Sequence, residues 1–162
     1  MAAPVYTGGL PYFKGGVRTK YKVKASGAAT VQLTRSQSNG IFLFDTATGI
    51  TYTLPTAVPG ITFTFQVTVS VTAAGYKVIT KNATEFLIGE LEGFNTASTD
   101  AQLAFHGDGS THVSVNMLAA TTNQAGGLIG SYLTFTCLTA TQWAVVGQFL
   151  SGTTATTPFA TS

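Results

Sequence analysis

Apolar and polar residues alternate without a fault over residues 61–72. The odd positions carry large apolar side chains, and the even positions carry Thr, Ser or Gln. Only a β-strand sends alternate side chains to opposite faces, whereas a helical period would spread the six apolar residues around the whole axis. We therefore expect a long strand with one buried face and one Thr-rich face turned to solvent or to a polar interface. The residues expected in the core are Phe63, Phe65, Val67 and Val69, faced by Trp143 and Val145.

Shorter segments of the same kind follow one another along the chain, separated by turn signals. Asn39-Gly40 and Gly107-Asp108-Gly109 are typical of hairpin turns, and no stretch has the period of an amphipathic helix. These features predict an all-β fold, a single β-sandwich or jelly-roll-like domain of about ten short antiparallel strands. The expected strands are residues 17–24, 29–35, 41–45, 50–54, 61–72, 76–81, 85–91, 102–106, 111–117, 131–137 and 142–149.

The two ends of the chain differ from this body. Residues 1–16 hold Pro4, Pro11 and two Gly-Gly pairs, which favour an extended arm over a helix. We expect an extended basic arm with a first strand over residues 1–24, a sandwich body over 25–153 and a tail of small residues over 154–162.

The composition narrows the possible classes of protein. Charged residues make up only 9% of the 162 residues, and apolar residues make up 44%. So few charges indicate that partners cover part of the surface, because a free monomer usually carries more charge for solubility. No apolar run is long enough for a transmembrane helix, and no signal peptide is visible. The single cysteine, Cys137, lies on an apolar face and is expected to be a small buried side chain.

Charge is divided unevenly along the chain. Six cations and no acid precede residue 40, whereas the remainder has two lysines and six acids, a net charge of −4. A basic N-terminal segment joined to an acidic remainder indicates contact with an acidic surface. Alternatively, a row of cations on one strand can be a solvated face that protects a sheet edge. Nucleic-acid binding would use aromatic residues among the cations, such as Tyr12, Phe13 and Tyr21; we expect no nucleic-acid partner and no membrane partner.

One group of residues could carry chemistry. His106, Asp108 and His112 could meet around a metal ion, but they flank an expected turn, where polar residues need no function. The chain has no Gly-x-Ser-x-Gly, phosphate-loop or HExxH motif. We expect no catalytic residues, no cofactor and no metal, and therefore a protein that is not an enzyme.

Several stretches together resemble the head decoration proteins of marine and cyanobacterial phages. The shared features are an aromatic strand, a Thr-Leu-Pro strand end, a Phe-x-Phe-x-Val strand, a Lys-Val-Ile strand and a closing Trp-containing strand. They lie at residues 42–45, 53–55, 60–67, 76–79, 143–148 and 151–153, so the resemblance covers about residues 40–153. It consists of strand and turn residues, and the basic arm departs from it.

The resemblance implies a structural virion protein on the exterior of an icosahedral phage capsid. Such proteins are trimeric β-sandwiches that cement neighbouring subunits of the major capsid protein, so a homotrimer is expected. The arm is the expected anchor, since its apolar residues would supply contact area and its cations would pair with capsid carboxylates. The expected capsid-binding residues are Tyr6, Leu10, Tyr12, Phe13, Lys14, Arg18, Lys20, Lys22 and Lys24.

Two other functions stay open at this point. Related domains occur in phage fibres, so a trimeric fibre or adhesin that binds a host-surface glycan is the alternative. Such an adhesin would need exposed aromatic side chains in a groove, and the candidates for these are Trp143 and Tyr132. A hydrolase would have to use His106, Asp108 or His112.

Overall fold

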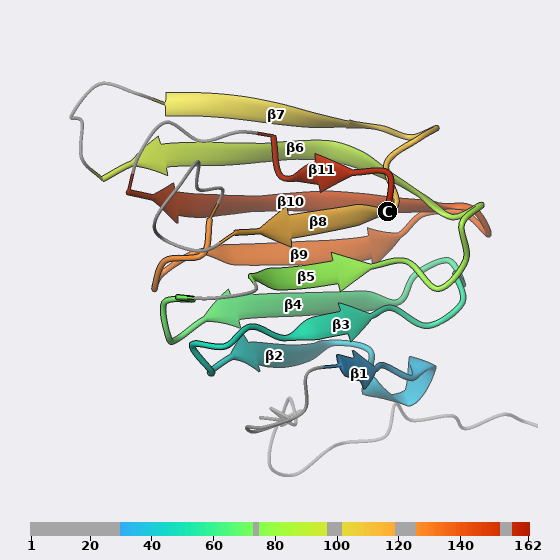
Figure 1. The fold of residues 1–162 in the computed structure, drawn as a ribbon. Coiled ribbons are helices and arrows are strands. Elements are labelled where there is room, and N and C mark those ends of the chain that lie inside the picture. Colours follow the sequence, from blue (N-terminus) through green and yellow to red (C-terminus); the bar gives the residue numbers. More distant parts are fainter. Residues whose placement is uncertain (1–29, 73–74, 97–101, 119–125, 153–156) are drawn as a thin grey trace, which may run out of the picture.

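The computed structural model describes residues 30–72, 75–96, 102–118, 126–152 and 157–162 (Figure 1). Over these residues the chain forms eleven strands and one short 3₁₀ turn. In chain order the elements are β1 (Thr30–Gln32), η1 (Arg35–Gln37), β2 (Gly40–Phe44), β3 (Thr51–Thr53), β4 (Thr62–Val67), β5 (Tyr76–Ile79), β6 (Phe86–Asn95), β7 (Gln102–Asp108), β8 (Ser114–Met117), β9 (Tyr132–Cys137), β10 (Gln142–Ser151) and β11 (Phe159–Ala160).

The strands form two sheets that pack face to face (Figure 1). One sheet has five strands in the order β1-β3-β5-β8-β11, and the other has six in the order β2-β4-β9-β10-β6-β7. The predicted all-β, sandwich-like domain is therefore confirmed.

The strands are not all antiparallel, as the sequence had led us to expect. β1 and β3, β3 and β5, β2 and β4, and β6 and β10 pair in parallel, whereas the other pairs are antiparallel. The reason is that the chain changes sheets after every strand from β1 to β5. Each return to a sheet therefore runs in the same direction as the visit before, and the alternation of residues along a strand contains no information about this winding.

The long strand predicted over residues 61–72 is shorter in the structure, because β4 ends at Val67. The backbone N–H groups of Thr68 and Val69 both donate to the carbonyl of Phe44, so the regular ladder stops here. Val71 is nevertheless buried, and its N–H group donates to the carbonyl of Gly127. The alternating sequence pattern thus extends beyond the end of β4.

The two predicted turns exist and connect the expected segments, but the strands on either side of each turn do not pair with each other as in a hairpin. Asn39, with a φ of 63°, leads from η1 into β2, so this connection passes from the five-stranded to the six-stranded sheet. The turn after Asp108 leads from β7 to β8 and crosses between the sheets in the opposite sense. Turn residues specify a local backbone conformation, and they leave open whether the flanking strands pair with each other.

The core between the sheets is rich in aromatic rings. Phe65 lies at its centre, with its ring centroid 5.2 Å from that of Tyr52 and 5.6 Å from that of Phe135. The predicted burial is confirmed for Phe63, Phe65, Val67, Trp143 and Val145, whereas Val69 is only half-buried.

Two core tyrosines of the five-stranded sheet form hydrogen bonds through their hydroxyl groups to backbone carbonyls outside that sheet. The hydroxyl of Tyr52 donates to the carbonyl of Leu43 at 2.9 Å, and that of Tyr76 contacts the carbonyls of Thr46 and Val69 at 2.8 and 2.6 Å. Burial, together with the negative charge of Asp45, raises the pKa of Tyr52 to about 12 and that of Tyr76 to about 12.

The sequence pattern did not predict β11. Residues 159 and 160 pair with Val115 and Ser114 of β8, and the Phe159 side chain is buried. The C-terminal end therefore forms the edge of the five-stranded sheet, and the carbonyl of Ser162 accepts hydrogen bonds from Lys77 and from Ser114.

Candidate functional site: the outer face of the six-stranded sheet

The outer face of the six-stranded sheet is built by the residues that alternate with the core residues. The strand register arranges them in rows that cross the sheet from β2 to β7. One row is Ile41, Thr64, Thr134, Val146, Glu90 and His106, and the next is Leu43, Gln66, Tyr132, Gln148, Glu92 and Ala104. Both rows are uncharged over four strands, and the charges begin at β6.

Threonines pair across the middle of this face. The hydroxyls of Thr64 and Thr134 are 3.2 Å apart, and those of Thr62 and Thr136 are 3.3 Å apart. Such cross-strand pairs stabilise a sheet by about 0.2–1 kcal/mol each. Because these hydroxyls bind each other, part of their hydrogen-bonding capacity is used within the sheet.

A shallow hollow of about 370 Å³ lies beside the threonines. Its lining residues are Glu90, Glu92, Tyr132, Val146, Gly147 and Gln148. The Gln148 amide donates to a Glu92 carboxylate oxygen at 3.1 Å, which holds that side chain over the sheet. The side chains of Val146 and Tyr132 are 55% and 41% exposed, so large apolar area faces solvent here.

This arrangement is suited to binding. Apolar side chains supply contact area, and the two carboxylates can accept hydrogen bonds from cations or hydroxyl groups of a partner. The sequence analysis had not singled out this hollow. Alternation along β6 indicates that Glu90 and Glu92 share a face, but only the register of β6, β9 and β10 brings Tyr132 and Val146 beside them.

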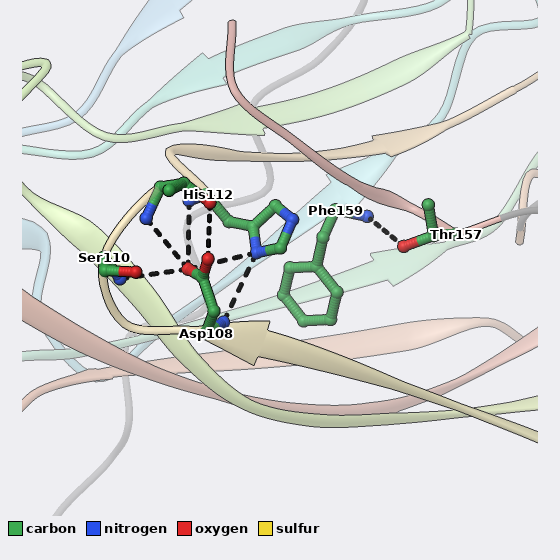
Figure 2. Close-up of polar contacts among 6 residues, drawn as sticks. Asp108, Ser110, His112, Thr157 and Phe159 are labelled. Carbon is green, nitrogen blue, oxygen red and sulfur yellow. Dashed lines mark hydrogen bonds and ion pairs between the residues drawn. The ribbon is translucent and has the colours of Figure 1, made fainter.

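The group of His106, Asp108 and His112 divides into two parts. His106 is exposed on β7, in register with Glu90. Asp108 and His112 instead organise the turn between β7 and β8, with Asp108 Oδ1 and His112 Nδ1 3.2 Å apart (Figure 2). The ring of His112 lies 5.5 Å from that of Phe159, at the edge of the five-stranded sheet.

Asp108 acts as the cap of this turn. Its Oδ1 atom accepts hydrogen bonds from the backbone N–H groups of Ser110 and Thr111, both at 2.9 Å, and its other oxygen contacts the hydroxyl of Thr111 (Figure 2). The Thr111 hydroxyl, together with these N–H groups, holds the pKa of Asp108 far below its usual range. A carboxylate held in this way fixes the crossing between the sheets.

Trp143 is fully buried, so of the two aromatic residues considered for a glycan groove only Tyr132 is exposed. The indole N–H of Trp143 donates to Glu85 Oε2 at 3.2 Å, and the backbone N–H of Ala57 donates to Glu85 Oε1 at 3.1 Å. Glu85 is itself buried. The sequence did not reveal that it accepts hydrogen bonds within the core.

The buried position predicted for Cys137 is confirmed. Its thiol donates to the carbonyl of Thr139 at 3.0 Å, and burial raises its pKa. The thiol is therefore a core group, as the alternating pattern around it had indicated.

The predicted capsid-binding residues lie outside the described residues. All nine, from Tyr6 to Lys24, fall in the segment 1–29. Within the described ranges, no helix is long and apolar enough to cross a membrane. In the same part of the chain, no three His, Cys, Asp or Glu side chains are placed to hold a metal ion.

Comparison of the chain with protein-family models, with curated proteins and with solved structures found no match in any of the three.

Proposed function

We propose that this protein is a structural virion protein that binds the outside of an icosahedral phage capsid and cements neighbouring major capsid subunits. The observation that carries the proposal is the outer face of the six-stranded sheet. It is broad and uncharged over four strands, and it exposes Tyr132 and Val146 beside the hollow. Exposed apolar area of this kind is typical of surfaces that bind other proteins.

Two features of the sequence support the same conclusion. The chain resembles phage head decoration proteins over about residues 40–153, and only 9% of its residues are charged. A homotrimer on the capsid exterior would cover part of this weakly charged surface and present several copies of each contact to the shell.

The basic segment before residue 25 is the proposed anchor on the capsid. It carries five cations and no acid, together with Tyr6, Leu10, Tyr12 and Phe13. Each exposed ion pair with a capsid carboxylate would contribute only about 0.2–1 kcal/mol. The anchor therefore depends on repetition across the trimer, and no single cation is decisive.

The experiment is to add purified protein to undecorated capsids of the source phage and to locate it by electron microscopy. We expect density on the outside of the shell for the intact chain. A variant lacking residues 1–16 should decorate weakly, and a variant with Arg18, Lys20, Lys22 and Lys24 reversed to Glu should lose most of the salt dependence of binding. Shells that stay bare with the intact chain would contradict the proposal, and full occupancy by the truncated chain would exclude the arm as anchor.

A second function, a phage fibre or adhesin that binds a host-surface glycan, is favoured by one observation. In the hollow, Tyr132 lies next to Glu92 and Gln148, so an aromatic ring and hydrogen-bonding groups share one site. Imaging of virions separates the two functions, because an adhesin would appear on the tail. Glycan binding that is abolished by Tyr132→Ala but retained by Leu138→Ala would support the adhesin.

A further inference from the structure

A second hollow, of about 450 Å³, lies on the outer face of the five-stranded sheet. The two sheets pack face to face, so this hollow is on the opposite side of the molecule from the one beside Tyr132 and Val146. Its volume is within the range of about 300–1,000 Å³ that is usual for small-molecule sites. Its lining includes Thr30, Thr51, Lys77, Asn116 and Leu118.

The strand register brings the polar residues of this hollow together. Thr30 pairs with Thr51, Thr51 with Lys77, and Lys77 with Asn116. One residue from each of β1, β3, β5 and β8 therefore stands in a single row across the sheet. The row faces outward, because the residues that alternate with it, such as Val78, are buried in the core.

Two glycines bring two connections together at this hollow. Gly49 precedes β3 and Gly75 precedes β5, and both have a φ of 92°, a conformation that favours glycine. A Cβ atom on Gly49 would collide with the carbonyl of Gly75, so the two backbones lie against each other. Leu118 lies next to Gly75 and is 43% exposed, so it adds apolar surface to the lining.

The uncharged polar groups of the row keep hydrogen-bonding capacity, unlike the paired threonines of the other sheet. Over the part of the chain that the structure describes, the side-chain hydroxyls of Thr30 and Thr51 make no hydrogen bond. The Asn116 side-chain oxygen accepts from the Ser114 hydroxyl at 3.3 Å, and its NH₂ group donates to no described residue. Two hydroxyls and an amide are therefore available to a ligand on one surface.

The lining of the hollow carries one charge, the ammonium group of Lys77. This group donates to the carbonyl of Ser162 at 2.8 Å, which holds it over the sheet and leaves two of its N–H groups for a ligand. The strands β1, β3, β5, β8 and β11 contain no acid. The site is therefore complementary to a ligand with one carboxylate and several hydroxyl groups, whereas a polyphosphate would require more cations.

We propose that this hollow binds a carboxylate-bearing saccharide. The carboxylate pairs with Lys77, the sugar hydroxyls exchange hydrogen bonds with Thr30, Thr51 and Asn116, and the C–H groups of the ring pack on Leu118. An acidic peptide would satisfy Lys77 but would offer few partners to the hydroxyl and amide groups of the row. The inference does not depend on the function proposed above, which uses the opposite face of the molecule.

Calorimetric titration of the full chain with oligogalacturonate, oligoalginate and sialyllactose tests the inference. At least one of them should bind, and its methyl ester, which has no charge, should bind at least about tenfold more weakly. Lys77→Met removes the charge and retains the aliphatic stem, so it should weaken binding at least about tenfold, and Thr51→Val should weaken it about threefold. The matched controls are Lys81→Met and Thr53→Val, which lie outside the hollow and should bind like the parent protein.

Four results would overturn the inference. These are no binding of any of the three saccharides, parent-like binding by Lys77→Met, equal binding of poly-glutamate, which would identify an acidic peptide as the ligand, or loss of binding in Tyr132→Ala, which would place the ligand in the other hollow. The comparison of each saccharide with its ester uses the unsubstituted chain, so it holds even if a variant fails to fold. Lys77→Met should still decorate capsids like the parent protein, which separates this test from that of the proposed function.

Discussion

The inner and outer faces of the six-stranded sheet are made by the same strands, and they are organised by different forces. On β4, Phe63 and Phe65 face the core, while Thr62 and Thr64 face outward. The inner residues interlock with aromatic rings of both sheets, so their identity is constrained by packing. The outer residues contact only their neighbours on one surface, so they are free to serve binding. Stability should therefore depend on the inner face and recognition on the outer face.

The largest effect is expected from Phe65→Ala. Phe65 is fully buried among aromatic rings of both sheets, so its truncation should lower the free energy of unfolding by about 3–5 kcal/mol. The matched control is Thr64→Ala on the outer face of the same strand, which should cost less than about 1 kcal/mol. Denaturant unfolding measures both. Equal losses would show that the two faces do not differ as described.

Glu85→Ala is expected to have the next largest effect. It leaves the indole N–H of Trp143 and the backbone N–H of Ala57 buried without their acceptor, at a cost of about 1–3 kcal/mol. Glu92→Ala, on the outer face, should change the free energy of unfolding by less than about 0.5 kcal/mol. If thermal or denaturant unfolding of the two variants coincides, Glu85 is not part of the core network.

Because of Tyr52 and Tyr76, the contribution of the inner face to the free energy of unfolding should depend on pH. Their pKa is about 12 in the folded state, compared with about 10 in an unfolded chain, so the folded state favours the neutral hydroxyl. Their contribution to stability is complete below pH 10 and is lost as the pH rises through 12. Tyr52→Phe with Tyr76→Phe should flatten this decline, whereas the exposed Tyr132→Phe should leave it unchanged. Unfolding measured from pH 8 to 12 tests the difference.

The sequence predicted the inner face better than the outer one, for a physical reason. Alternation along a single strand identifies which side chains are buried, and Phe63, Phe65 and Trp143 are in the core as expected. The site depends on which strands are neighbours. The parallel pairing of β6 with β10 brings Glu90 beside Val146, and no local pattern in either strand indicates that pairing.

The same limit applies to the turns and to the two ends of the body. The residues around Asn39 and Asp108 specify turns, but their strands lie in different sheets because tertiary packing decides the partners. The two residues of β11 are too few for an alternating pattern, and their place beside β8 comes from the burial of Phe159.

The most direct test of the account is a substitution that alters the outer face alone. Val146→Glu places a charge beside the hollow, and Leu138→Glu is its matched control, since Leu138 is 49% exposed and lies outside the strands, just after β9. Both variants should unfold within about 0.5 kcal/mol of the parent protein. In co-sedimentation with undecorated capsids, we expect Val146→Glu to weaken binding at least about tenfold, a loss of about 1.4 kcal/mol, and Leu138→Glu to bind like the parent. Parent-like binding by Val146→Glu would contradict the claim that this face is the contact surface.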